Sequence, residues 1–112
     1  ETFKIEDDYP AEVTKEDTKA ILEAYKSQYD PADDNDTWFG KVREMAVNMG
    51  FAAKPKDFKK NPDQYKGHVG HVSGVIRIAL TGRTNAPDLW EVQQILGVEE
   101  INRRLDQAIT SL

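Results

Sequence analysis

Apolar residues recur at the spacing of an α-helix in several short segments of this chain, and glycine, proline or acidic runs separate one segment from the next. A helix that buries one face repeats its apolar residues every three or four positions, whereas a half-buried strand alternates them. Such short amphipathic helices bury their apolar stripes by packing on one another. The pattern therefore predicts an all-α fold, a small orthogonal bundle of about five helices.

The chain opens with residues 1–13, whose acidic residues and proline predict a linker or an irregular lead-in. The helical domain is then expected to span 14–112. Its first helix should begin at Thr14, since Thr14 and Asp17 fit a variant of the capping box. Pro31 and the acidic run around it should end that helix. Its apolar stripe contains Ala20, Ile21, Ala24, Tyr25 and Tyr29.

The second helix is expected to begin at Asp36 or Thr37. It should end before Gly50, because glycine suits the left-handed position just past a helix end. Residues 51–70 then predict a long basic loop with room for one short helical turn, and a loop of that length is often functional. The apolar stripe of the second helix contains Trp38, Val42, Met45, Ala46 and Met49.

Three further helices are predicted in the second half. The first covers residues 71–81; its β-branched residues would also suit a strand, and Gly82 as a C-terminal cap favours the helix. The next should begin near Asn85 and Pro87 and end at Gly97. The last follows directly. The residues expected to be buried in the last two helices are Leu89, Val92, Ile95, Leu96, Ile101, Leu105, Ala108 and Ile109.

Two histidines stand three residues apart in the segment Gly-His-Val-Gly-His, at His68 and His71. Such a pair could share a metal ion on a helix, but a zinc site needs further protein ligands. The chain has no cysteine, and no carboxylate stands at a recognisable spacing. No nucleophile and base pair stands out either. We therefore expect no catalytic residue and no metal or other cofactor here, and interpret the histidines as a polar start to the third helix.

The same segment could also bind a phosphate through backbone N–H groups at a helix start. No Gly-Lys-Ser/Thr follows it, so it is not a P-loop. Its Gly-x-x-Gly spacing matches the KH-domain clamp on RNA, but that clamp belongs to a mixed α/β domain. A flexible turn before a helix is the simpler interpretation.

Charge is distributed unevenly along the chain. Residues 1–50 carry 6 Lys or Arg and 13 Asp or Glu, a net of −7, and residues 51–112 carry 9 and 7, a net of +2, which together give the formal charge of −5. Any contact with a polyanion should therefore lie in the second half. The alternative is a solubilising surface on an acidic protein.

A series of short motifs follows in a fixed order from residue 74 to residue 105. They are Arg77-Ile-Ala-Leu-Thr-Gly, Pro87-Asp-Leu, Leu96-Gly-Val-Glu and Arg104-Leu. The series resembles the C-terminus of bacterial glutamyl-tRNA synthetases, which shows Leu-Arg-x-Ala-Leu-Thr-Gly, Pro-x-Leu, Leu-Gly-x-Glu and Arg-Leu in this order. Ile76 replaces the usual Leu, and Ala86 stands where some relatives carry Thr.

The resemblance implies an all-helical domain that reads the anticodon of tRNA(Glu), following a catalytic body in the same polypeptide. That body carries the motifs His-Ile-Gly-His and Lys-Met-Ser-Lys-Ser, and neither occurs here. The resemblance therefore implies a parent glutamate–tRNA ligase that uses ATP and Mg²⁺, with no cofactor in this chain.

The resemblance also implies which residues meet RNA. Arg77 is expected to hydrogen-bond to an anticodon base, since a guanidinium offers a planar fork of donors. An internal salt bridge to an early acidic residue is the alternative. Pro87 and Leu89 are expected to line the anticodon pocket. Arg83, in the turn between two helices, is expected to contact a phosphate.

A lysine-rich stretch in the basic loop extends this interpretation beyond the family resemblance. Phe58 and Tyr65 are interleaved with five lysines there and could stack on bases. The lysines expected to follow the RNA backbone are Lys59, Lys60 and Lys66.

Two other functions stay open. The acidic first half would suit a non-catalytic helical module that binds another protein. A freestanding regulator derived from a synthetase would keep the RNA-binding fold without catalysis. The motif series favours the synthetase domain over both. No apolar stretch reaches the length of a membrane span, so we expect a cytoplasmic protein with neither a membrane nor DNA as a partner.

Overall fold

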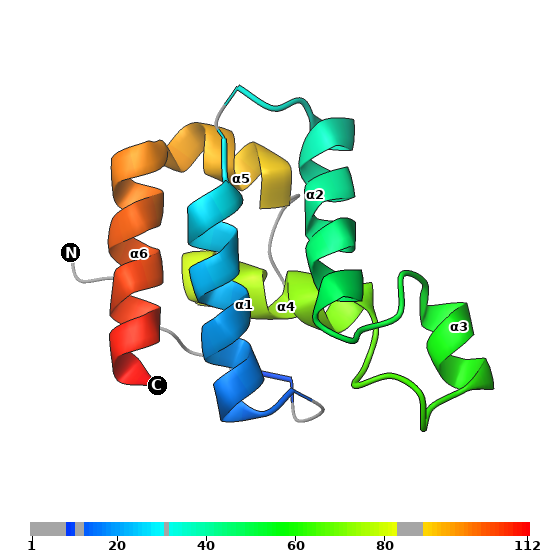
Figure 1. Ribbon diagram of the computed structural model, residues 1–112. Helices are drawn as coiled ribbons and strands as arrows, with labels where there is room; N and C mark the ends of the chain where they lie inside the picture. The colour runs from blue at the N-terminus through cyan, green and yellow to red at the C-terminus, as the bar shows by residue number, and fades with distance from the viewer. Residues whose placement is uncertain (1–8, 11–12, 31, 83–88) are drawn as a thin grey trace.

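The computed structural model describes residues 9–10, 13–30, 32–82 and 89–112, and this described part contains six helices and no named strand. The all-α prediction is confirmed, and the additional helix is a short one inside the predicted basic loop (Figure 1). The helices are α1 (Lys15–Gln28), α2 (Asn35–Asn48), α3 (Pro55–Lys60), α4 (Val69–Thr81), α5 (Leu89–Leu96) and α6 (Val98–Ser111).

The helices cross one another in an orthogonal arrangement. Figure 1 shows α6, α1 and α2 standing side by side while α4 runs across them, and α4 contacts all three. Helix α5 packs against α6, and α3 stands apart from the bundle at the right of the view. Helix α4 is therefore the element that the others are built around.

Side-chain caps explain where the first two helices begin. The Thr14 hydroxyl accepts a hydrogen bond from the Asp17 backbone N–H at 3.0 Å, as the sequence predicts. Helix α2 begins before the predicted Asp36, because the Asp34 carboxylate accepts from the Thr37 backbone N–H at 2.8 Å. This hydrogen bond lowers the pKa of Asp34.

The core surrounds α4, which is apolar on most of its circumference. Its fully buried residues are Val72, Val75, Ile76, Ile78, Ala79 and Leu80. Helices α1 and α2 add Ile21, Leu22, Tyr25, Val42 and Ala46, and α6 adds Ile101, Leu105 and Ala108. The core also includes part of the lead-in. Val13 is a buried member of the core, and Tyr9 packs against the core.

One part of the buried set was predicted wrongly. Ile95 was expected in the core, but it is 84% exposed, and Gln93 is fully buried instead. Helix α5 buries Leu89 and Gln93, which lie four positions apart on one narrow face. Two residues further along an α-helix a side chain points to the opposite side. Ile95 therefore faces outward from Gln93.

In the described part of the chain, no helix combines the length and the apolar character that crossing a membrane requires.

Candidate nucleic-acid interface

Arg77 lies on the face of α4 that turns away from the core. Ser73, Gly74, Arg77 and Thr81 are half-buried on this face and follow one another at helical spacing. The Arg77 Nε is buried and has no hydrogen-bond partner among the described residues. No ion pair to Arg77 occurs in that part of the chain, so the alternative of an internal salt bridge finds no support there. An unpartnered buried donor loses its hydration without compensation.

The C-terminal end of α4 is held by several hydrogen bonds. Gly82 has the left-handed φ of 79° that its predicted capping role requires, and its N–H donates to the Ile78 carbonyl at 2.7 Å. Arg104 of α6 donates from Nη1 to the Leu80 carbonyl at 2.5 Å. A cation at this end also complements the negative end of the helix dipole. Leu80 and Gly82 are therefore held in position at the end of α4.

Arg104 is oriented in turn by Glu100, one helical turn earlier in α6. The Glu100 carboxylate accepts from Arg104 Nε at 2.6 Å and from both Nε and Nη2 of Arg103, at 2.9 and 2.6 Å. These hydrogen bonds hold the pKa of Glu100 at about 2, below its usual 4.5. In the sequence Arg104 stands out only as part of a motif; its hydrogen bond to Leu80 spans 24 residues, which no local spacing reveals.

Three of the predicted RNA contacts follow α4 in the sequence. Arg83 and Pro87 lie outside the described residues. Leu89 is the first residue of α5 and is only 2% exposed, packed in the core. A contact between RNA and the Leu89 side chain therefore requires α5 to move.

The basic loop forms an arm that is closed at its base. We call residues 53–66 the lysine arm; it contains α3. The Ala52 N–H donates to the Gly67 carbonyl at 2.9 Å, and the Lys66 N–H donates to the Gly50 carbonyl at 3.0 Å. The Val69 N–H completes the closure by donating to the Ala52 carbonyl at 2.9 Å.

The three lysines predicted to contact RNA differ in their surroundings. Lys59 and Lys60 are exposed in the last turn of α3. Neither forms an ion pair within the described residues. The Lys66 ammonium instead pairs with Asp17 of α1 at 3.2 Å. Lys59 and Lys60 are thus available to a phosphate, whereas Lys66 would first leave a carboxylate.

Phe58 contacts histidines of the neighbouring helix. Its ring lies 5.9 Å from the His68 ring and 6.0 Å from the His71 ring, measured between centroids. The two imidazoles lie 4.0 Å apart and cap the first turn of α4, each through its Nδ1. The interpretation of His68 and His71 as a polar helix start is confirmed, and the segment is a hydrogen-bonded cap where a flexible turn was expected. Histidine is not among the usual capping residues, so the sequence carried no signal for it.

Two of the candidate contacts are joined by α4. The lysine arm joins its N-terminal end, and Arg77 lies in its second half. A helix of 13 residues is roughly 20 Å long at 1.5 Å per residue. The lysine arm and Arg77 are therefore separated along the helix.

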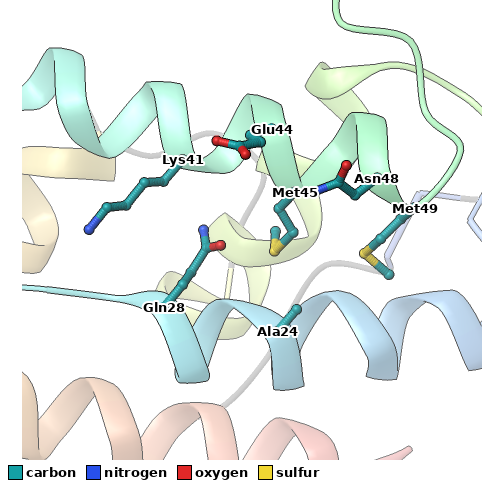
Figure 2. A pocket seen from close by; sticks show the side chains of 7 residues that line it. All are labelled: Ala24, Gln28, Lys41, Glu44, Met45, Asn48 and Met49. Carbon is teal, nitrogen blue, oxygen red and sulfur yellow. The ribbon is translucent and has the colours of Figure 1, made fainter.

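A separate groove lies between α1 and α2, with a volume of about 500 Å³ (Figure 2). Figure 2 shows Met45 and Met49 reaching toward Ala24 and Gln28 of α1, with Lys41, Glu44 and Asn48 along the α2 side. None of the predicted RNA contacts lines it. The described residues also include no group of three or more side chains that could hold a metal ion.

Comparison with known proteins gives a consistent result. A family model described as an anticodon binding domain matches residues 56–109. A glutamate–tRNA ligase of Acetivibrio thermocellus is 54% identical over 97% of this chain and 20% of the relative. Glutamate–tRNA ligases of Clostridium perfringens and Sorangium cellulosum are 45% and 40% identical over 86% and 88% of the chain and 18% and 17% of the relatives. The chain thus spans about one fifth of the length of these relatives, and no solved structure matches it.

Proposed function

We propose that the chain is an anticodon binding domain, that it is the C-terminal part of a glutamate–tRNA ligase and that it contacts the anticodon of tRNA(Glu). The observation that carries the proposal is the similarity to these ligases along nearly the whole chain. It includes α1 and α2, which lie outside the segment that the family model matches.

The activity of the parent protein follows as part of the same proposal. The parent joins glutamate to tRNA(Glu) with ATP and Mg²⁺ in a catalytic body on the same polypeptide, in the cytoplasm. The present chain supplies RNA contacts. No metal site is assigned to it, because its described residues bring no three ligands together.

Arg77 is the residue for which the geometry gives the strongest support as a base contact. It is half-buried on α4 and forms no ion pair within the described residues. A guanidinium in this setting can donate two parallel hydrogen bonds to a base edge or stack on its face. Arg83 and Pro87, which follow α4 in the sequence, and the backbone at Leu89 complete the proposed anticodon contact.

The first experiment measures binding of the chain to tRNA(Glu) and to the same tRNA with an exchanged anticodon. We expect Arg77→Ala to lower the preference for the native anticodon about 10- to 100-fold, equivalent to roughly 1–3 kcal/mol. Arg43→Ala is the matched control, because it removes an equal charge from α2, where Arg43 lies over the Phe39 ring. Equal loss of affinity for both tRNAs in the Arg77 variant would contradict base recognition by this residue.

A further inference from the structure

We propose that His68 and His71 are positioning residues that hold the lysine arm in one orientation for contact with RNA phosphates. The inference rests on the proposed function and extends it to two residues that neither the motif series nor the lysine pattern includes. Its basis is a chain of contacts that leads from the first turn of α4, through the two imidazoles, to the middle of α3.

The first link is a reciprocal cap. The His68 Nδ1 accepts a hydrogen bond from the Gly70 N–H at 3.0 Å, and the His71 Nδ1 accepts one from the His68 N–H at 3.1 Å. The first N–H groups of a helix have no partner within the helix, so these bonds satisfy donors that would otherwise be left open. Because each Nδ1 is an acceptor, neither carries a proton in this arrangement.

The second link is close packing of the rings on the backbone. A Cβ atom added at Gly67 would lie 2.5 Å from the His71 Nδ1, and one added at Gly70 would lie 2.6 Å from the His68 Cε1. Any side chain at either position would displace an imidazole. The segment Gly-His-Val-Gly-His therefore acts as one unit, in which the glycines make room for the rings that cap the helix.

The third link joins the cap to the arm. Phe58 lies in the middle of α3 and contacts both imidazoles, edge-on at 89° in the case of His71. Helix α3 has no fully buried residue, so few other contacts fix its direction. Lys59 and Lys60 follow Phe58 directly in the sequence. The orientation of the two lysines thus depends on the ring that the histidines hold.

Ordered lysines meet several phosphates at once, and the number of phosphates contacted is measurable. Each phosphate contact releases condensed counterions, so the slope of log affinity against log salt reports how many contacts form. A residue that only stabilises the fold changes the folded fraction and leaves this slope unchanged once the protein is folded. A positioning residue lowers the slope.

The test measures binding of the whole chain to tRNA(Glu) over a salt series. We expect His68→Ala combined with His71→Ala to reduce the slope by about one to two, as does the loss of one or two lysine contacts. Lys59→Gln with Lys60→Gln should give a similar reduction, and combining both pairs should add little. His68→Asn in place of His68→Ala supplies a side-chain oxygen acceptor at the cap but no ring for Phe58, so it should raise the melting temperature of the double variant and leave the slope reduced.

Two further variants separate positioning from stability. Thr14→Ala removes a comparable cap from α1 and should lower the melting temperature without changing the slope. Phe58→Leu breaks the link between cap and arm while leaving the cap intact, and should lower the slope even if the histidine variant does not fold. If neither the histidine variant nor Phe58→Leu alters the slope, the positioning role of the histidines is wrong, while the proposed function still stands. Wild-type binding without any salt dependence would instead overturn the proposed function, and the role of the arm with it.

Discussion

At the scale of single residues, two glycines show how backbone conformation alone sets the effect of a substitution. Gly40 lies exposed inside α2 and Gly97 lies between α5 and α6, and among the described residues nothing lies within 4 Å of an added Cβ at either position. Gly97 has φ 82° and ψ 161°, a region that residues other than glycine hardly populate. Both positions therefore have room for a side chain, and they differ in the backbone strain that a side chain would cause.

We predict opposite effects for the same substitution at these positions. Gly40→Ala should raise the free energy of unfolding by about 0.5–1 kcal/mol, because it reduces the entropy that the helix interior loses on folding. Gly97→Ala should lower it by roughly 1–3 kcal/mol through backbone strain. Urea denaturation of both variants beside the wild type checks this. Effects of the same sign would show that the backbone conformation at Gly97 is not retained.

Residue-level prediction from the sequence worked where a residue type has one dominant local use. Thr14 as a helix cap and Gly82 in a left-handed position are confirmed, because each effect involves only a few neighbouring residues. The capping by His68 depends on the orientation of an imidazole ring and on the absence of a side chain at Gly70. A single sequence does not reveal such a combination, because no residue preference for helix caps points to it. Arg77 could be named as a candidate, but its buried Nε is visible only in the fold.

At the scale of elements, α6 and α4 are joined by Glu100 through Arg104. The folded state holds the pKa of Glu100 at about 2, against the usual 4.5. In the unfolded chain this carboxyl therefore takes up a proton more readily, and acidification favours unfolding. The stabilising contribution is fully present above the usual carboxyl pKa of 4.5 and is lost as the pH falls from there through about 2.

We therefore predict that the difference in melting temperature between the wild type and Glu100→Gln shrinks as the pH falls through this window. Thermal unfolding at a series of pH values measures it. Glu99→Gln is the matched control, since Glu99 lies one position earlier in the same helical turn and forms no ion pair within the described residues. A difference for Glu100→Gln that stays constant with pH would contradict the role of the ionised carboxylate.

The helices themselves were predictable because their apolar spacing and their stop signals agree. The rotation of α5 was not. Its sequence offers apolar side chains on two sides, at Leu89 and at Ile95, and only packing against α6 decides which side is buried. Helix α3 agrees with the short helical turn expected within residues 51–70, but its position was not predictable, because it has no fully buried residue and carries no apolar stripe.

At the scale of the whole molecule, the segment that matches the family model is not a complete core. Residues 56–109 include α4 but not α1 and α2, which cover α4 with Ile21, Leu22, Val42 and Ala46. A peptide of that length without its two largest packing partners buries too little apolar surface to offset its conformational entropy.

We predict that the peptide 56–109 does not fold cooperatively, whereas the whole chain does. Circular dichroism during heating distinguishes a sigmoidal transition from a gradual loss of helix. The control is the same peptide mixed with a second peptide that contains α1 and α2. Recovery of a transition on mixing would agree with the prediction, and a cooperative transition in the isolated peptide would refute it.

The net acidic charge of the molecule was a poor guide to the site, while the position of the charges was a better one. The carboxylates concentrate in residues 1–50, and the lysine arm and Arg77 lie beyond them in the sequence. What the sequence could not supply was the placement of the arm relative to Arg77. That placement follows from α4, whose N-terminal end the arm joins.

Because the base of the lysine arm is closed by backbone hydrogen bonds, residues 53–66 can be replaced by another segment without rebuilding the helical bundle. The chain leaves the bundle at Ala52 and returns at Gly67, and these two residues are hydrogen-bonded to each other. With its ends already joined, a segment can change length at small entropic cost, roughly 0.6 kcal/mol for each doubling. Evolution or a protein engineer can therefore replace the segment, with a longer cationic hairpin or a reporter peptide, and keep the scaffold that presents it.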